Sequence, residues 1–168
     1  MVLTGIQRQA QDAMADKLWP VLEELLRRHA VEILGCNEYD GSWPFLHCFL
    51  MYNPPSDLCA KIVDMIVHHI GVEPFMVSNA YNWLPIHFVA FYCHAMTPSV
   101  FATLLALTSA AGLRQEDIDG DTPLDDLQNH NRSPHKAALV ELYQEALADH
   151  ATFEARYHPL VSAACMPW

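Results

Sequence analysis

Basic side chains are scarce in this chain, which carries 9 Lys and Arg against 20 Asp and Glu and a formal net charge of −11. Proteins that bind nucleic acid or anionic membrane surfaces do so through basic patches. The charge balance therefore argues against a nucleic-acid partner and against an anionic membrane surface. It favours a partner protein whose surface is basic or apolar.

Long apolar runs are also missing. No stretch of about 18 apolar residues is available to cross a bilayer, and residues 1–9 hold neither the apolar region nor the cleavage site of a secretion signal. The cysteines are scattered and form no Cys-x-x-Cys pair; they are Cys36, Cys48, Cys59, Cys93 and Cys165. Because an odd number of thiols without a secretion signal is typical of reduced proteins, we expect an intracellular protein, cytoplasmic or nuclear, with no membrane insertion.

Residue patterns typical of catalysis or metal binding are sparse. The chain has 6 glycines and no glycine-rich run that could cradle a phosphate. His68 and His69 are adjacent and point to different sides of a helix, and no ligand spacing such as His-x-x-x-His supports a zinc site. Cys93 could be paired with His47 or His94 as a nucleophile and its base, but neighbouring residues on a helix do not face each other. We therefore expect no catalytic residue, no metal and no cofactor.

Apolar residues at helical spacing are abundant. With 168 residues, 52% of them hydrophobic, the chain is long enough for one domain with a sizeable core. Strict alternation is absent, whereas the apolar positions 21, 22, 25, 26, 30, 33 and 34 make one helical stripe. Proline and glycine divide the rest into antiparallel helix pairs, which we expect at 44–52 with 56–70, 85–94 with 98–111, and 123–130 with 134–149. The predicted fold class is all-α.

The stretch at residues 116–125 predicts a tight turn followed at once by a helix. Asp119 and Gly120 supply the turn, Thr122 is suited to cap the helix, and Pro123 is suited to its first turn. The order Asp-x-x-Gly-x-Thr-Pro-Leu resembles the opening of an ankyrin repeat. A related order occurs at residues 79–87, where Asn82 stands for the glycine, and a weaker one at residues 40–47. The spacing is about 40 positions against a usual period of about 33, so these would be long, degenerate repeats.

The resemblance to ankyrin repeats implies a stacked helix-turn-helix solenoid. Residues 1–150 would form an ankyrin-like repeat domain of about three repeats with N-terminal cap helices, and residues 151–168 a C-terminal tail or cap. His47 and His87 match the structural, hydrogen-bonding histidine of the repeat, although the threonine that pairs with it is missing in both units. An irregular helical bundle is the alternative fold.

The resemblance also implies a non-catalytic protein–protein interaction module, because ankyrin-like proteins generally bind partners through the projecting turns and the concave face of the first helices. Carried over to this chain, Val89 and Ala90 fall on buried positions. The positions expected to contact a partner are aromatic in the middle and acidic toward the C-terminal end; they are Trp43, Tyr52, Tyr81, Trp83, Phe88, Phe91, Tyr92, Asp119, Asp121 and Asp126.

Two alternatives to this interpretation stay open. Aromatic residues at helical spacing are as common in cores as in interfaces, so the repeat inserts or the C-terminal tail could cover them. The chain could also be a structural or accessory subunit whose apolar face is permanently buried in a larger assembly or a homo-oligomer.

Overall fold

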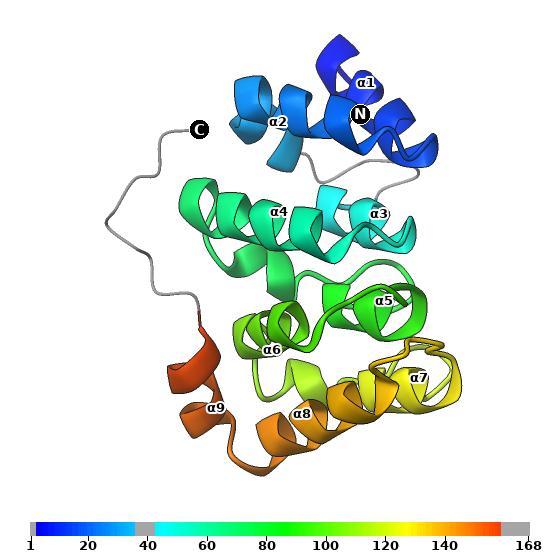
Figure 1. Cartoon of the computed structure of the whole chain (residues 1–168), viewed down its shortest axis with the longest axis vertical. Helices are drawn as coiled ribbons and strands as arrows, with labels where there is room; N and C mark the ends of the chain where they lie inside the picture. Colours follow the sequence, from blue (N-terminus) through cyan, green and yellow to red (C-terminus); the bar gives the residue numbers. More distant parts are fainter. Residues whose placement is uncertain (1–2, 36–42, 159–168) are drawn as a thin grey trace.

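The structure, a computed structural model, describes residues 3–35 and 43–158 (Figure 1). These residues form helices and short 3₁₀ turns and no β-strand, so the all-α prediction is confirmed. The elements are α1 (Gly5–Ala15), α2 (Trp19–Leu34), α3 (Phe45–Met51), α4 (Ser56–His69), η1 (Glu73–Met76), α5 (Pro85–Tyr92), α6 (Pro98–Leu107), η2 (Gly112–Arg114), α7 (Pro123–Asn129), α8 (Lys136–Ala148) and α9 (His150–Tyr157). The predicted turn at Asp40 lies outside the described residues.

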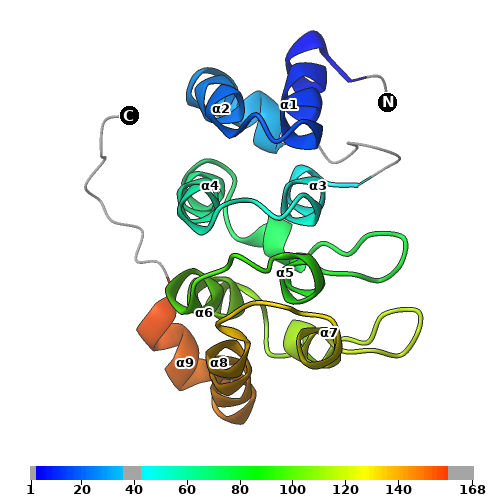
Figure 2. The same ribbon diagram turned by 45° about the vertical axis from the view of Figure 1, so that its right-hand side comes forward.

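The helices lie in two rows (Figure 2). One row runs α1, α3, α5, α7, and the other runs α2, α4, α6, α8; within each row, every helix contacts the next. Each row therefore places consecutive helix pairs side by side. The longer segments before α5 and before α7 project beyond the first row as loops (Figure 2).

Proline starts several of the helices, as the sequence predicts. Pro85, Pro98 and Pro123 each occupy the first turn, where the missing backbone N–H has no partner to lose. At α7 the cap is complete: Thr122 Oγ1 accepts a hydrogen bond from the backbone N–H of Asp125 (3.3 Å), and Asp125 Oδ2 accepts one from the backbone N–H of Thr122 (2.9 Å). Such a reciprocal pair satisfies two of the unpaired donors at the helix start.

Several helix ends differ from the prediction by one to four residues, and two of these differences have a clear local cause. The helix expected to run to residue 111 ends at Leu107, because Thr108 is extended (φ −95°, ψ 131°) and its hydroxyl donates to the carbonyl oxygen of Leu104 (2.9 Å). The helix expected from residue 134 begins at Lys136. Asn131 holds the preceding turn, since its side-chain amide donates to the carbonyl oxygen of Ala90 (2.7 Å) and its Oδ1 accepts from the N–H of Ser133.

The segment after α8 is helical up to Tyr157 and covers part of the second row. Helix α9 contacts both α6 and α8, and Phe153 is 1% exposed beneath it. His150 Nε2 donates to the carbonyl oxygen of Thr108 (2.8 Å), at the point where α6 ends. Residues 150–157 thus pack against the second row.

The core lies between the two rows. Ile86, Leu104 and Leu105 are at most 2% exposed, as expected for residues of the core. Val89 and Ala90 are also buried, which confirms their predicted positions. Among the described helices, none combines the length and the hydropathy needed to cross a membrane.

Candidate functional site

The two projecting loops are built alike. In the first loop, Asn79 Oδ1 accepts hydrogen bonds from the backbone N–H groups of Tyr81 (2.9 Å) and Trp83 (3.0 Å). In the second, Asp117 Oδ1 accepts from Asp119 (2.8 Å) and Asp121 (3.1 Å), at the same offsets. A short polar side chain therefore folds each loop onto itself.

A residue with positive φ lies in each turn. Asn82 has φ 61° and Gly120 has φ 89°. The sequence predicts this equivalence, because Asn is the residue other than Gly that adopts the left-handed conformation most readily.

The loops are joined to each other. The backbone N–H of Ile118 donates to the carbonyl oxygen of Tyr81 (3.2 Å), and the side-chain amide of Asn82 donates to that of Glu116 (2.6 Å). Trp83 adds a third link, since its indole N–H donates to Asp117 Oδ2 (2.7 Å). The two loops consequently form one surface.

Two buried histidines fix this surface to the helices. His87 Nδ1 accepts from the backbone N–H of Leu84 (3.1 Å), and its Nε2 donates to the carbonyl oxygen of Gln115 in the next loop (3.1 Å). His47 Nε2 donates to the carbonyl oxygen of Trp83 (3.0 Å). Burial lowers the pKa of both imidazoles to about 4, although the bonds to backbone carbonyls oppose that change. Both rings are therefore neutral at pH 7, and they make structural hydrogen bonds without the expected threonines.

Aromatic rings gather where these loops meet α3 and α5. Trp83 lies 5.0 Å from Phe88, 5.5 Å from Phe91 and 6.1 Å from Tyr92, measured between ring centroids. Trp43 lies 5.3 Å from Phe88, and the two planes are nearly perpendicular. Of the predicted contact residues, the structure brings six together, and we call them the aromatic cluster: Trp43, Tyr81, Trp83, Phe88, Phe91 and Tyr92.

A depression of about 190 Å³ opens into this cluster. Its lining comes from α5, from the segment just before α3 and from both loops: Trp43, Asn79, Tyr81, Trp83, Phe88, Tyr92, Ile118 and Asp119. Tyr81 is 51% exposed and Ile118 is 63% exposed at its edge. Tyr52, predicted as a contact residue, is half-buried where α3 ends and is not among the lining residues.

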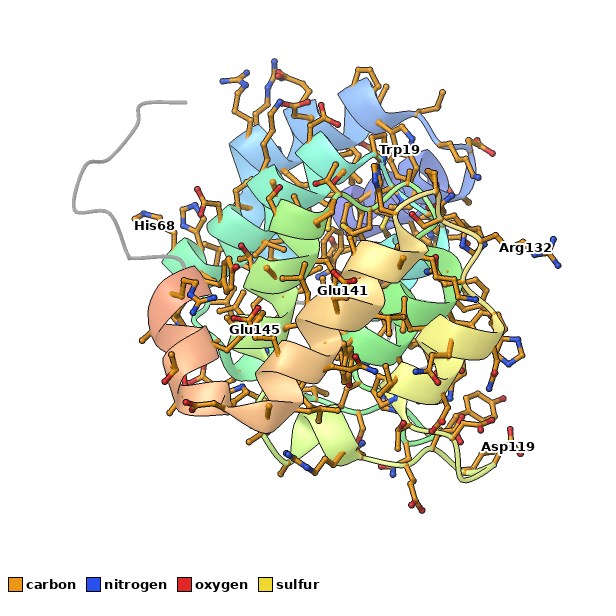
Figure 3. All side chains as sticks on the ribbon, turned by 60° about the horizontal axis from the view of Figure 1, so that its bottom comes forward. Trp19, His68, Asp119, Arg132, Glu141 and Glu145 are labelled. Carbon is orange, nitrogen blue, oxygen red and sulfur yellow. The ribbon has the colours of Figure 1, made fainter. Side chains whose placement is uncertain are left out.

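The predicted acidic contact residues, Asp119, Asp121 and Asp126, divide into a surface part and a buried part. Asp119 is exposed and lines the depression, and Asp121 is half-buried in the same loop. Figure 3 shows Asp119 at the tip of the loop before α7, whereas Arg132 projects beyond the other end of that helix. Partial burial raises the pKa of Asp117, but hydrogen bonds from Asp121, Trp83 and Asp119 outweigh it, so the pKa lies below its ordinary value of 3.8. Asp117 thus carries a negative charge under the cluster.

Two of the predicted contact residues are not at the surface. Phe88 is 1% exposed, because α3 packs on α5 and His47 lies 5.2 Å from its ring; it forms the floor of the depression. Asp126 is 2% exposed, because α7 packs between α5 and α8. Burial raises the pKa of Asp126 to about 7, and the neighbouring carboxylates of Asp117, Asp121 and Asp125 add to the effect. The expectation that Phe88 and Asp126 are exposed was therefore wrong.

The cysteine–histidine pairs considered above do not form a nucleophilic site. Cys93 is 0% exposed, and its thiol donates to the carbonyl oxygen of Leu50 (3.3 Å). Burial raises its pKa well above 9.0, so the reactive thiolate is not formed at neutral pH. In the part of the chain that the structure describes, no group of three or more His, Cys, Asp or Glu side chains is arranged to hold a metal ion.

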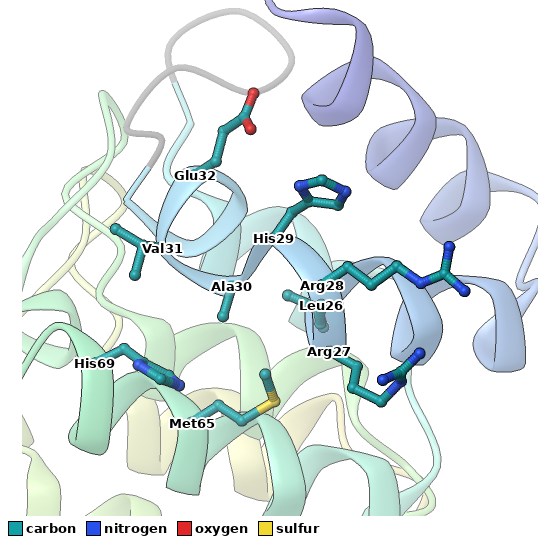
Figure 4. Close-up of a pocket in the computed structure, with 9 residues that line it drawn as sticks. All are labelled: Leu26, Arg27, Arg28, His29, Ala30, Val31, Glu32, Met65 and His69. Atoms are coloured by element: carbon teal, nitrogen blue, oxygen red, sulfur yellow. The ribbon is translucent and has the colours of Figure 1, made fainter. Parts of the chain in front are cut away.

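A second depression, of about 310 Å³, lies between α2 and α4 (Figure 4). It forms where α2 is kinked at His29, whose backbone is not helical (φ −136°, ψ 31°). Figure 4 shows Met65 and His69 extending from α4 toward α2, whereas the side chains of His29 and Glu32 extend away from α4. Because the titratable groups do not converge, this depression has no catalytic arrangement.

Comparison with models of known families finds no match, and neither curated proteins nor solved structures give a significant one. The functional interpretation therefore rests on the geometry of this chain alone.

Sequence reasoning missed three residues of this site. Asn79 and Ile118 line the depression, and Asp117 holds the indole of Trp83. A signal exists for each. Asn79 and Asp117 occupy the same position in two similar turns, and Ile118 is an apolar residue in a turn that is otherwise acidic.

Proposed function

We propose that this chain is a non-catalytic protein-interaction module with an ankyrin-like, solenoidal stack of helix pairs, which binds a partner protein through the aromatic cluster and the two loops. The contacts between successive helices of each row support the fold proposal. So do the hydrogen bonds from His47 and His87, each of which joins a helix pair to the loop of the next pair.

One observation carries the functional proposal: Tyr81 and Ile118, two large exposed side chains, border the depression in the aromatic cluster. Single exposed apolar residues need no explanation, and several occur elsewhere on this chain. Tyr81 and Ile118, however, are adjacent, exposed by 51% and 63%, and lie beside the half-buried rings of Trp43, Trp83 and Tyr92. Aromatic anchors around a depression typify the centre of a protein interface.

A capture experiment tests this proposal. Immobilised protein is incubated with native cell extract, and the retained proteins are compared between the wild type, a Tyr81→Ser/Ile118→Ser variant and a Val31→Ser control, which alters an exposed residue (64%) on α2. We expect a specific partner to be retained by the wild type and the control and lost by the double variant. Equal retention by all three would contradict the proposed surface.

Phe91→Ala distinguishes an interface from a covered core. Phe91 is half-buried and stacks on His130 at 4.6 Å. If this face binds a partner, the variant keeps its helical circular dichroism and weakens binding by about 2 kcal/mol or more, as central aromatics do. Global unfolding of the variant would assign the ring to the core instead.

The alternative, a subunit permanently buried in a larger assembly or a homo-oligomer, is favoured by the same exposed apolar residues. Light scattering coupled to size exclusion separates the two. A stable monomer supports the interaction module, and a concentration-independent oligomer that dissociates on Tyr81→Ser/Ile118→Ser supports the alternative.

A further inference from the structure

We propose that the depression in the aromatic cluster binds a methylated lysine side chain of the partner protein. This inference rests on the proposed function and names the chemical group that the surface recognises.

The walls of the depression present aromatic faces in several directions. Trp43 is nearly perpendicular to Tyr81 (83°, centroids 6.3 Å apart), and Trp83 is nearly perpendicular to Phe88 (75°). Tyr92 is tilted by 48° relative to Trp83. The face of an aromatic ring is the negative end of its quadrupole, and several rings around one space form the arrangement that binds alkylated ammonium groups.

The charges around the depression are negative. Asp119 belongs to its lining. Asp117 accepts the indole N–H of Trp83 at 2.7 Å, and this hydrogen bond to a carboxylate makes the ring system more electron-rich. Both effects favour a cation over a neutral apolar group.

Nothing in the neighbouring sequence supplies that cation. Between Lys61 and Arg132, the sequence contains one Lys or Arg, Arg114. Its guanidinium donates to the carbonyl oxygens of Ala110 (2.9 Å) and Leu147 (2.6 Å), on the side of α8 and η2. The positive charge that would complement this site therefore comes from another molecule.

The size and the hydrogen-bonding capacity of the depression select the form of the cation. About 190 Å³ is smaller than a pocket for a drug-sized ligand, which begins near 300 Å³, and suits the end of one side chain. An unmodified ammonium has three N–H donors and is strongly hydrated. Asn79 Oδ1 already accepts two backbone N–H groups and the walls are aromatic faces, so the charged acceptor that the lining offers is the carboxylate of Asp119 at the exposed edge. A trimethylammonium group needs no hydrogen-bond acceptors, so it loses least on entering this site.

The test uses four probes and the indole N–H signals in ¹⁵N–¹H spectra of the full chain. Three are identical short capped peptides that differ at one position: trimethyllysine, lysine, and a neutral analogue in which a tert-butyl group replaces trimethylammonium. The fourth is tetramethylammonium chloride. We expect saturable shifts of the Trp43 and Trp83 signals with the trimethyllysine peptide. Binding of the other three should be about tenfold or more weaker, in line with the strength of desolvated cation–π contacts.

Matched variants locate the binding. Tyr81→Ala should abolish it, and Asp119→Asn should weaken it about threefold and reduce its dependence on salt, because a rim charge acts through a screened field. Val31→Ala, at an exposed position of α2, should bind like the wild type. Retained helical circular dichroism establishes that each variant is folded.

Several outcomes would overturn the inference. Equal binding of the neutral analogue would show an apolar pocket with no preference for cations, and equal binding of lysine would show no need for methylation. Tetramethylammonium binding as tightly as the peptide would assign the site to a free small amine. If no probe binds while the capture experiment still retains a partner through Tyr81 and Ile118, this inference fails and the proposed function stands.

Discussion

Asp126 offers the sharpest test of the packing around α7. Its side chain is 2% exposed, and no described residue hydrogen-bonds to its Oδ2. Burial and three neighbouring carboxylates raise its pKa from 3.8 to about 7. The fold therefore prefers the protonated form. The stability that Asp126 contributes is fully present below pH 3.8 and is lost as the pH rises to about 7, because the unfolded chain ionises first.

The size of the effect follows from that difference. Roughly three pH units at 1.36 kcal/mol each give an upper bound of about 4 kcal/mol. Water and salt screen part of the repulsion from Asp121 and Asp125, which are half-buried. We expect about 2 kcal/mol.

The variant Asp126→Asn keeps the shape of the side chain and removes its ionisation. Urea unfolding followed by circular dichroism at pH 4, 5.5, 7 and 8.5 gives the free energy of unfolding of wild type and variant. Between pH 4 and pH 8.5, the variant should gain about 2 kcal/mol relative to the wild type. Asp119→Asn removes one charge at an exposed position and serves as the control. A difference between Asp126→Asn and wild type that stays constant across this range would refute the reasoning.

Three further predictions use the same unfolding assay. Leu105→Ala should lower the free energy of unfolding by about 2–5 kcal/mol, because it leaves a cavity between α6 and its neighbours. The control Val31→Ala should change it by less than about 0.5 kcal/mol. A loss below about 1 kcal/mol at Leu105 would show looser packing. His87, with its pKa lowered to about 4 by burial, should lose its stabilising contribution as the pH falls from 6.5 toward 4, so the difference between wild type and His87→Gln should shrink by about 1–3 kcal/mol between pH 7.5 and 4.5. Gly120→Ala should cost about 1–2 kcal/mol through its positive φ alone, since no atom lies within 4 Å of the added Cβ, and an unchanged stability would contradict the left-handed turn.

The helix pairs were predictable because the local sequence marks where several of the helices begin. Pro85, Pro98 and Pro123 occur where a backbone donor is dispensable, and the apolar spacing after them is helical. The ends were less predictable. Thr108 terminates α6 because its hydroxyl donates to the carbonyl oxygen of Leu104. Asn131 holds the turn before α8 because its side-chain amide donates to Ala90 in α5, which lies 41 positions earlier in the sequence.

The candidate site was predictable to the extent that its residues share turn positions. Tyr81, Trp83 and Asp119 meet because two similar loops lie next to each other. The burial of Phe88 and Asp126 was not predictable, because it depends on which neighbouring helix covers each face of α5 and α7. The sequence around Phe88 and Asp126 carries no local sign of that packing.

The hydrogen bonds from His47 to Trp83 and from His87 to Gln115 have a kinetic consequence. Each joins one helix pair to the next along the chain, over 36 and 28 positions. In the solenoidal arrangement proposed above, folding can begin in one unit and spread, and the end units open more often than the middle ones. Amide hydrogens in α1 and α2 should therefore exchange faster than those in α5. Opening of the first pair would leave the rings around Trp83 in place, so the chain can lose its N-terminal helices transiently without losing the surface between its two loops.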